Sequence, residues 1–156
     1  MRLALYQPDI PQNAGSLMRL CACLGVALDI IEPCGFLLSD RNFHRAGMDY
    51  AARADIQRHE SWSRFQETRG PGRLVLLTTK AAQPYAGFAF AASDTLLVGQ
   101  ESAGVPPEVH DAANAKVVIP MRAGFRSLNV AQTAAMVLGE ALRQTNQFPG
   151  MESSCT

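Results

Sequence analysis

The chain of 156 residues lacks several features that assign a protein to a class at once. No stretch approaches the roughly 20 apolar residues of a membrane-spanning helix, and the N-terminal apolar run is too short for a signal peptide. Acidic and basic residues number 14 each, so no overall charge attracts nucleic acid. With 47% hydrophobic and 18% charged residues, the composition excludes a disordered chain. We therefore expect one cytoplasmic domain over residues 1–156, with a frayed tail from about residue 148.

Several sequence patterns of cofactor sites are also missing. The four cysteines, Cys21, Cys23, Cys34 and Cys155, form no Cys-x-x-Cys pair, and no histidine lies at metal-ligand spacing from them. We expect buried thiols in a reducing compartment and no metal site. The chain also lacks a Gly-x-Gly-x-x-Gly fingerprint and a Gly-Lys-Ser/Thr phosphate loop, which argues against a standard dinucleotide or ATP site.

What is present is a succession of short apolar runs that alternate with helical patterns. Short and mainly apolar segments predict buried strands at Leu3–Tyr6, Ala27–Ile31, Leu74–Leu77, Leu96–Val98 and Val117–Ile119. Apolar residues at three- and four-residue spacing predict one helix capped by Asn13 and another capped by Asn129 or Ser127. A shorter amphipathic helix is predicted around Trp62 and Phe65. This alternation predicts an α/β fold, a parallel sheet with helices on both faces.

In such sheets, ligands bind beyond the carboxyl ends of the strands, and polar loops follow the predicted strands here. The first loop, residues 7–19, carries Asn13 and Arg19. The second, residues 99–104, places Glu101 between glycines that let a ligand approach the backbone closely. The third, residues 120–129, combines two arginines and Ser127 at a helix start that offers unpaired N–H groups. Taken singly, each has a plainer explanation as a tight turn, a surface arginine or a helix cap.

A basic and aromatic segment is a further candidate for nucleic-acid contact. Between residues 41 and 73, seven arginines stand against four acidic residues, interleaved with Phe43, Tyr50, Trp62 and Phe65. Such a mixture can hold an RNA backbone and stack on bases, although composition favours the alternative of a solvated face with ordinary core aromatics. The histidines, His44, His59 and His110, are scattered, and we assign them no role.

Taken together and in order, the three loops resemble the motifs of the SPOUT methyltransferases, enzymes that use S-adenosylmethionine. The first motif is Pro11–Gly15 followed by Arg19–Ala22, the second is Leu97–Pro106, and the third is Val118–Met121 leading to Ser127–Asn129. The resemblance covers nearly the whole chain, from Leu3 to about Gln144. Within the class, residues 5–15, 30–36 and 77–80 are most similar to the minimal members that methylate a tRNA wobble ribose.

The resemblance implies a fold, a reaction and partners. The fold is the SPOUT α/β-knot with a C-terminal trefoil knot, and the enzyme is a homodimer whose active sites form at the subunit contact. The cofactor is S-adenosyl-L-methionine. The methyl group goes to the 2′-oxygen of the wobble cytidine or uridine in the anticodon stem-loop of certain tRNAs, with leucine-type tRNAs as expected substrates. No metal or membrane takes part.

The resemblance also implies roles for individual residues. The cofactor contacts carried over by motif are Leu77, Thr78, Gly99, Glu101, Gly104, Ile119, Ser127 and Leu128. The catalytic group comprises Arg19, Asn13, Glu101 and Asn129, in which Glu101 and Asn129 brace the loops. An arginine with a pKa above about 12 is a poor base, so Arg19 is expected to orient the ribose and stabilise charge. A substrate phosphate would take the proton. The sequence departs from such relatives at Ala103, where they commonly carry arginine, and at Gln132.

Three other functions fit parts of the same pattern. The enzyme could methylate another tRNA or rRNA ribose, or the scaffold could be a non-catalytic RNA-binding module. A flavodoxin-like nucleotide protein is the third alternative, because it too would place its ligand at the strand ends of a parallel sheet.

Overall fold

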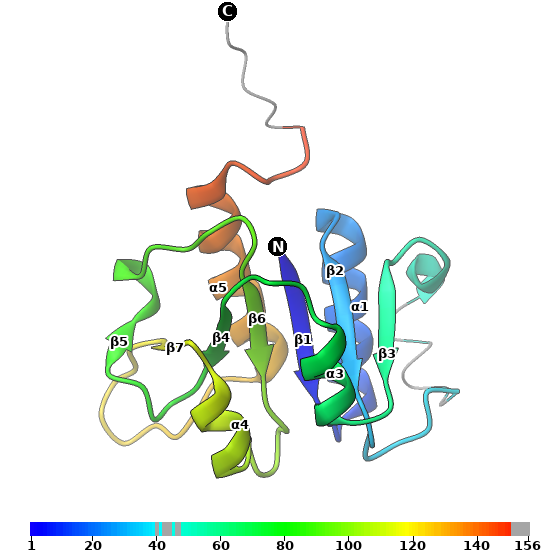
Figure 1. Cartoon of the computed structure of the whole chain (residues 1–156), viewed down its shortest axis with the longest axis horizontal. Helices are drawn as coiled ribbons and strands as arrows, with labels where there is room; N and C mark the ends of the chain where they lie inside the picture. The colour runs from blue at the N-terminus through cyan, green and yellow to red at the C-terminus, as the bar shows by residue number, and fades with distance from the viewer. Residues whose placement is uncertain (40, 42–44, 46–47, 151–156) are drawn as a thin grey trace, which may run out of the picture.

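The computed structural model describes residues 1–39, 41, 45 and 48–150, and it contains a seven-stranded sheet in which every pairing is parallel (Figure 1). The strand order is β3-β2-β1-β6-β4-β7-β5. The strands are β1 (Arg2–Tyr6), β2 (Ala27–Ile31), β3 (Ile56–His59), β4 (Leu74–Leu77), β5 (Gln83–Pro84), β6 (Thr95–Val98) and β7 (Ala115–Val118). The predicted α/β class with a parallel sheet is confirmed.

Helices cover both faces of this sheet (Figure 1). They are α1 (Pro11–Leu24), α3 (Trp62–Thr68), α4 (Pro107–Ala112) and α5 (Val130–Thr145), with 3-10 helices η1 (Met48–Ala52) and η2 (Tyr85–Gly87). The long helices α1 and α5 lie on one face, and the short helices α3 and α4 lie on the other. Among the described residues, no helix is long and apolar enough to cross a membrane.

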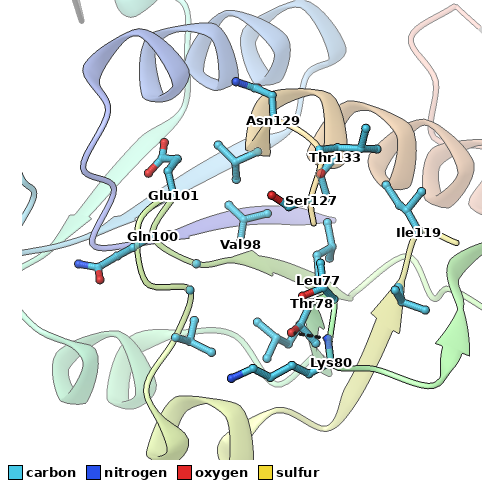
Figure 2. A pocket seen from close by; sticks show the side chains of 18 of the residues that line it. Leu77, Thr78, Lys80, Val98, Gln100, Glu101, Ile119, Ser127, Asn129 and Thr133 are labelled. Carbon is cyan, nitrogen blue, oxygen red and sulfur yellow. Dashed lines mark hydrogen bonds between the residues drawn. The ribbon is translucent and has the colours of Figure 1, made fainter. Parts of the chain in front are cut away.

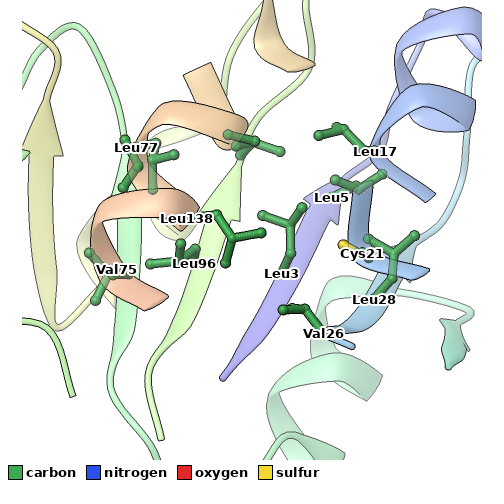
Figure 3. Close-up of a cluster of buried hydrophobic side chains, with 14 of the residues drawn as sticks. Leu3, Leu5, Leu17, Cys21, Val26, Leu28, Val75, Leu77, Leu96 and Leu138 are labelled. Atoms are coloured by element: carbon green, nitrogen blue, oxygen red, sulfur yellow. The ribbon is translucent and has the colours of Figure 1, made fainter. Parts of the chain in front are cut away.

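The core is divided by the sheet into two layers, as the alternation of side chains along β1 requires. Leu3 and Leu5 point to the side of α1 and α5, whereas Ala4 and Tyr6 point to the side of α3 and α4. Figure 3 shows Leu138 of α5 packed beside Leu3 in the first layer. Full burial of such a leucine contributes about 1.5–3 kcal/mol, so the two apolar layers hold the strands in register.

Element boundaries agree with the sequence where a segment is mainly apolar. Strands β2 and β4 have the predicted bounds, and every side chain of β4 is buried. The strand predicted at Val117–Ile119 is β7, which begins earlier and ends at Val118. The sequence missed β3 because it is a mostly polar edge strand, β5 because it has two residues, and α4 because it begins with a proline inside a loop.

The two long helices differ in how they begin. As predicted, Asn129 is the N-cap of α5, and its side chain accepts hydrogen bonds from the backbone N–H groups of Ala131 and Gln132. The predicted cap of α1 is wrong. That helix begins at Pro11, a residue suited to a first turn because it lacks the N–H, and Ile10 in the cap position makes no side-chain bond. Asn13 therefore lies inside the helix, and its side-chain amide bonds to Glu101 and Asn129 instead of capping α1.

The remaining expectations concern the cysteines, the C-terminal tail and the knot. Cys21 is buried as predicted and Cys34 is half-buried, but the buried thiol predicted at Cys23 is wrong, because positions two apart on a helix face different directions. Cys155, Phe43, His44 and residues 151–156 of the predicted frayed tail lie outside the described residues. The C-terminal trefoil knot stays a prediction.

Candidate functional site

A cavity of about 540 Å³ opens at the carboxyl ends of β4, β6 and β7, beside the first turns of α1 and α5. Its walls come from the three loops that the sequence singled out, together with residues 77–80 after β4. Figure 2 shows Asn129 and Glu101 toward one end of the cavity and Lys80 toward the other. The volume lies within the usual range for a small-molecule site, about 300–1,000 Å³.

The second loop folds back on itself tightly because of its glycines. Gln100 and Gly104 exchange two backbone hydrogen bonds of 2.9 Å. Gly104 has a φ of +69°, a left-handed conformation that other residues rarely adopt. A Cβ on Gly99 would lie 2.6 Å from the carbonyl carbon of Gly104, closer than real contacts allow. Both glycines are therefore required by the shape of this loop, which presents backbone to the cavity.

Glu101 ties the second loop to the first. Its Oε1 accepts a hydrogen bond of 3.1 Å from Nδ2 of Asn13, and its Oε2 accepts one of 3.2 Å from the backbone N–H of Asp9. In return, the backbone N–H of Glu101 donates to Oδ1 of Asp9 at 3.0 Å. This reciprocal pairing fixes the start of α1 against the loop after β6.

Asn13 passes the connection on to the third loop. Its Oδ1 accepts a hydrogen bond of 3.0 Å from Nδ2 of Asn129, whose own Oδ1 caps α5. The three side chains Glu101, Asn13 and Asn129 therefore form a continuous chain across all three loops. The structure brings together three of the four residues predicted as the catalytic group, and it gives them bracing contacts.

Asp9 is a member of this cluster that sequence reasoning missed. Its Oδ2 accepts from the backbone N–H of Ser102 at 3.3 Å and from the Ser102 hydroxyl. The hydrogen bond with Glu101 lowers the pKa of Asp9, whereas burial, and then Asp9 itself, raise the pKa of Glu101. The pair is therefore arranged for an ionised Asp9 beside a Glu101 that holds its proton more readily. An acidic residue three positions after the end of β1 was the available signal.

All eight residues predicted to contact the cofactor line the cavity. They are Leu77, Thr78, Gly99, Glu101, Gly104, Ile119, Ser127 and Leu128. Between them they supply apolar walls, hydroxyls and exposed backbone. His110, to which the sequence assigned no role, also lines the cavity, and its buried Nε2 has no hydrogen-bond partner among the described residues.

Arg19 is not among the described residues that line this cavity. It follows Asn13 by six residues on α1, which places it about 9 Å further along the helix and roughly 120° around it. Its guanidinium carbon lies 5.2 Å from the centroid of the Tyr50 ring. Arg19, the fourth residue predicted to be catalytic, therefore does not contribute to the cavity of its own chain.

The basic segment contributes mostly to the structure itself. Arg58 pairs with Glu32, Arg64 pairs with Glu67, and Arg73 binds Asp94. The aromatic residues Trp62 and Phe65 pack with Tyr6 in the core layer beneath α3. This agrees with the alternative explanation that the aromatic residues belong to the core. His59 is buried, and its Nε2 lies 2.8 Å from Oδ1 of Asp29. Among the described residues, no group of three potential ligands is arranged to hold a metal ion.

Similarity to known proteins is extensive. The sequence matches the SpoU rRNA Methylase family over residues 1–139. A protein of Beijerinckia indica named tRNA (cytidine(34)-2'-O)-methyltransferase is 62% identical over 144 residues, which cover 91% of this chain and 90% of that protein. A relative of the same name from Escherichia coli strain K12 is 39% identical over 152 residues and 96% of each chain.

Solved structures agree in fold. One described as "Structural insights into the 2-OH methylation of C/U34 on tRNA" has a TM-score of 0.88 and 40% identity, covering 92% of this chain and 94% of that one. The SpoU methyltransferase AviRb from Streptomyces viridochromogenes, in complex with the cofactor AdoMet, has a TM-score of 0.85 and 25% identity, over 92% of this chain and 57% of that one. With the family matched over most of its length, the chain belongs to the SpoU methylase family.

Proposed function

We propose that this protein transfers a methyl group from S-adenosylmethionine to the 2′-oxygen of the wobble cytidine or uridine of tRNA. The observation that carries the proposal is the convergence of three separate loops on one cavity lined by every residue predicted to contact the cofactor. Its relatives at 62% and 39% identity bear the name of the same reaction. We further propose that residues 1–156 form a single domain that acts in the cytoplasm.

The cavity has the chemistry that a nucleoside-containing cofactor needs. Leu77, Ile119 and Leu128 offer apolar surface for a flat base, and Gly99 leaves backbone groups open to hydrogen bonding. The unpartnered Nε2 of His110 offers a further polar contact. When bound, S-adenosylmethionine supplies an electrophilic methyl group on a positively charged sulfur atom. The residues of this chain hold that group in place, and their contribution to catalysis is to position the reacting atoms.

The bracing chain of Glu101, Asn13 and Asn129 keeps the three loops at fixed separation. Positioning of two reacting atoms in near-attack geometry can lower a barrier by about 7–11 kcal/mol, and it requires rigid walls. In the proposed reaction the bond from the 2′-oxygen to the methyl carbon forms as the carbon–sulfur bond breaks. The hydroxyl proton passes to a phosphate oxygen of the substrate.

Arg19 would serve the site of a second copy of the chain. It is exposed and lies away from its own cavity, so a catalytic role requires the cavity of a partner. The rim of the cavity carries the exposed apolar residues Ile10 and Leu128, and Met136 is exposed further along α5. These side chains favour coverage by a homodimer partner, because exposed apolar surface gains free energy when it is buried. The guanidinium, always protonated, would stabilise negative charge on the ribose oxygen.

Methyl transfer from labelled cofactor to purified RNA tests the proposal. We expect label in tRNA from cells that lack this protein, and mapping should place it on the ribose of nucleotide 34. A tRNA with a 2′-deoxyribose at that nucleotide is the matched control and should accept no label. Label that appears only in rRNA would favour the other ribose substrates, and failure to bind S-adenosylmethionine by calorimetry would favour the non-catalytic module.

A further inference from the structure

The third loop carries an exposed aromatic side chain that does not line the cavity. Phe125 is 73% exposed, and among the residues that the structure describes no other aromatic side chain is exposed to that extent. The whole stretch from Arg122 to Asn129 is exposed with it. A single exposed apolar residue is common on protein surfaces, so its position and its neighbours decide what it can bind.

A glycine turn fixes the place of Phe125. Its backbone N–H donates to the carbonyl oxygen of Arg122 at 3.4 Å, and Gly124 between them has a φ of +91°. A positive φ at the third position of a four-residue turn is typical of a type II turn, which favours glycine there. The first and fourth residues of such a turn have Cα atoms less than about 7 Å apart. Arg122 and Phe125 therefore extend from neighbouring points of the loop.

The turn lies at the edge of the cavity. Met121 and Ser127, on either side of it, both line the cavity wall. Two residues of extended chain span at most about 7 Å, so Phe125 is within that backbone distance of Ser127. When a nucleotide places its ribose in the cavity, its neighbours in the strand come close to this ring.

The charge of the third loop, residues 120–129, suits a polyanion. Arg122 and Arg126 are exposed, and neither forms an ion pair or a side-chain hydrogen bond with another described residue. The loop contains no acidic residue, whereas the exposed Arg64 on α3 has its partner in Glu67. A second copy of the same loop would bring like charges, but the phosphates of a nucleic acid would pair with both guanidinium groups.

We propose that Phe125 is a stacking platform for single-stranded RNA, on which a base next to the wobble nucleotide lies while Arg122 and Arg126 bind the flanking phosphates. Bases in RNA loops can be splayed out and stacked on aromatic side chains, and arginine binds phosphate through two parallel hydrogen bonds. This role rests on the proposed function, because it places the anticodon loop over the cavity. The ring binds the substrate and takes no part in the transfer of the methyl group.

Binding of a fluorescently labelled anticodon stem-loop to the full chain, followed by anisotropy, tests this role without turnover. In Phe125→Ala we expect the Kd for the RNA to rise at least about fivefold, the lower end of the effect of removing a base–aromatic stack. Phe125→Trp keeps a flat ring and should stay within about twofold of wild type. Phe125→Leu keeps apolar surface without a flat ring and should resemble Phe125→Ala. Leu37→Ala, at a side chain of similar exposure on another loop, is the matched control and should leave the Kd unchanged.

The salt dependence of the same binding separates the two arginines from the ring. Each arginine that neutralises a phosphate of a single strand contributes about 0.7 to the slope of log Kd against log salt concentration. Arg122→Gln and Arg126→Gln should each lower the slope by about that amount, and Phe125→Ala should leave it unchanged. Arg64→Gln, which removes an arginine already paired with Glu67, is the matched control and should also leave it unchanged.

Three results would overturn the inference. One is wild-type RNA affinity in Phe125→Ala. Another is a Phe125→Leu variant that binds RNA as tightly as Phe125→Trp, since the flat ring would then not matter. The third is a changed oligomeric state of Phe125→Ala in sedimentation, which would assign Phe125 to a contact between subunits. If the wild-type protein binds the stem-loop but transfers no methyl group, the proposed reaction fails while the RNA contact stands.

Phe125→Trp also reports the contact directly. The wild-type chain has one tryptophan, Trp62, which packs against the core layer beneath α3. Emission from Phe125→Trp should therefore be quenched by the stem-loop beyond any change that the wild-type protein shows. Equal changes of emission in both proteins would contradict a base stacked on the side chain at this position.

Discussion

The Asp29 cluster, formed by Asp29, Arg2 and His59, and the pair Asp9 and Glu101 are built in opposite ways. Asp29, on β2, is 2% exposed and lies between Arg2 of β1 and His59 of β3. Arg2 donates to both of its oxygens, at 2.7 and 2.9 Å, and His59 lies 2.8 Å away. Asp9 and Glu101, at the strand ends, are bound by backbone N–H groups, Asn13 and Ser102, with no cation in an ion pair among the described residues.

The difference shows how one fold separates stability from function. A buried carboxylate with an arginine and a histidine on its two neighbouring strands locks β1, β2 and β3 together, and both of its oxygens are already hydrogen-bonded. A carboxyl pair held by amides can brace loops at the rim of a cavity while one member keeps a raised pKa. Perturbed carboxyl groups in a cavity are typical of functional sites, whereas compensated ones in a sheet are structural.

The largest expected effect is on the Asp29 cluster. Asp29→Asn leaves Arg2 without its buried counterion, and we expect the free energy of unfolding to fall by about 3–5 kcal/mol. Urea denaturation measures this loss. Glu67→Gln, which breaks an exposed ion pair with Arg64, is the matched control and should produce no measurable change. A loss in Asp29→Asn as small as the control would remove the distinction between the two clusters.

The next effect belongs to the brace at the cavity. Glu101→Ala removes the acceptor for both Asn13 and the Asp9 backbone, so the first and second loops separate. We expect the free energy of unfolding to fall by about 1–2 kcal/mol and the Kd for S-adenosylmethionine to rise about tenfold. Calorimetry gives the Kd. Glu101→Gln keeps an acceptor oxygen and should stay within about threefold of wild type; equal weakening in both variants would show that charge, rather than bracing, is what Glu101 supplies.

A smaller effect distinguishes the two bonds that Asn129 makes. Asn129→Ala removes both the helix cap and the bond to Asn13 and should lower the free energy of unfolding by about 1 kcal/mol. Asn129→Ser keeps a capping oxygen and removes only the bond to Asn13, so we expect about half of that loss. Chemical denaturation of the two variants side by side decides the point. Identical losses would mean that the connection between the first and third loops adds nothing.

The smallest effect is on pH dependence. Because burial and Asp9 raise the pKa of Glu101 on folding, its proton contributes stability that is complete below the ordinary value of 4.5 and is lost as pH rises through the folded pKa. Asp9, with a lowered pKa, contributes stability present above its ordinary value of 3.8 and lost as pH falls through the folded pKa. Glu101→Gln cannot lose this proton. Its stability relative to wild type should therefore increase from about pH 4.5 upward, and a flat difference would contradict the raised pKa.

The sequence predicts those parts of the molecule that depend on local pattern. Strands β2 and β4 are mainly apolar runs, and Asn129 stands before a long apolar stripe, so each could be recognised without tertiary information. Asn13 misled the prediction because asparagine also caps helices, and only the packed loops show that its amide binds Glu101 and Asn129. A local pattern does not specify which of two partners a polar side chain meets.

The parts of the molecule that the sequence did not predict depend on contacts between distant segments. His59 is buried only because β3 pairs with β2, and β3 itself is a polar edge strand without an apolar signal. The place of Arg19 over Tyr50 depends on how η1 packs against α1. Motif resemblance supplied the cavity residues in advance, since it carries three-dimensional information that composition and periodicity do not contain.

The claim on which the others depend is that three loops form one cofactor cavity, and a crystal structure with S-adenosylhomocysteine tests it most directly. We predict that the adenosine lies between Leu77, Ile119 and Leu128, with its sugar against the backbone of Gly99. Density for the ligand at another surface, with this cavity left empty at saturating concentration, would contradict the cofactor site and the methyl transfer proposed from it.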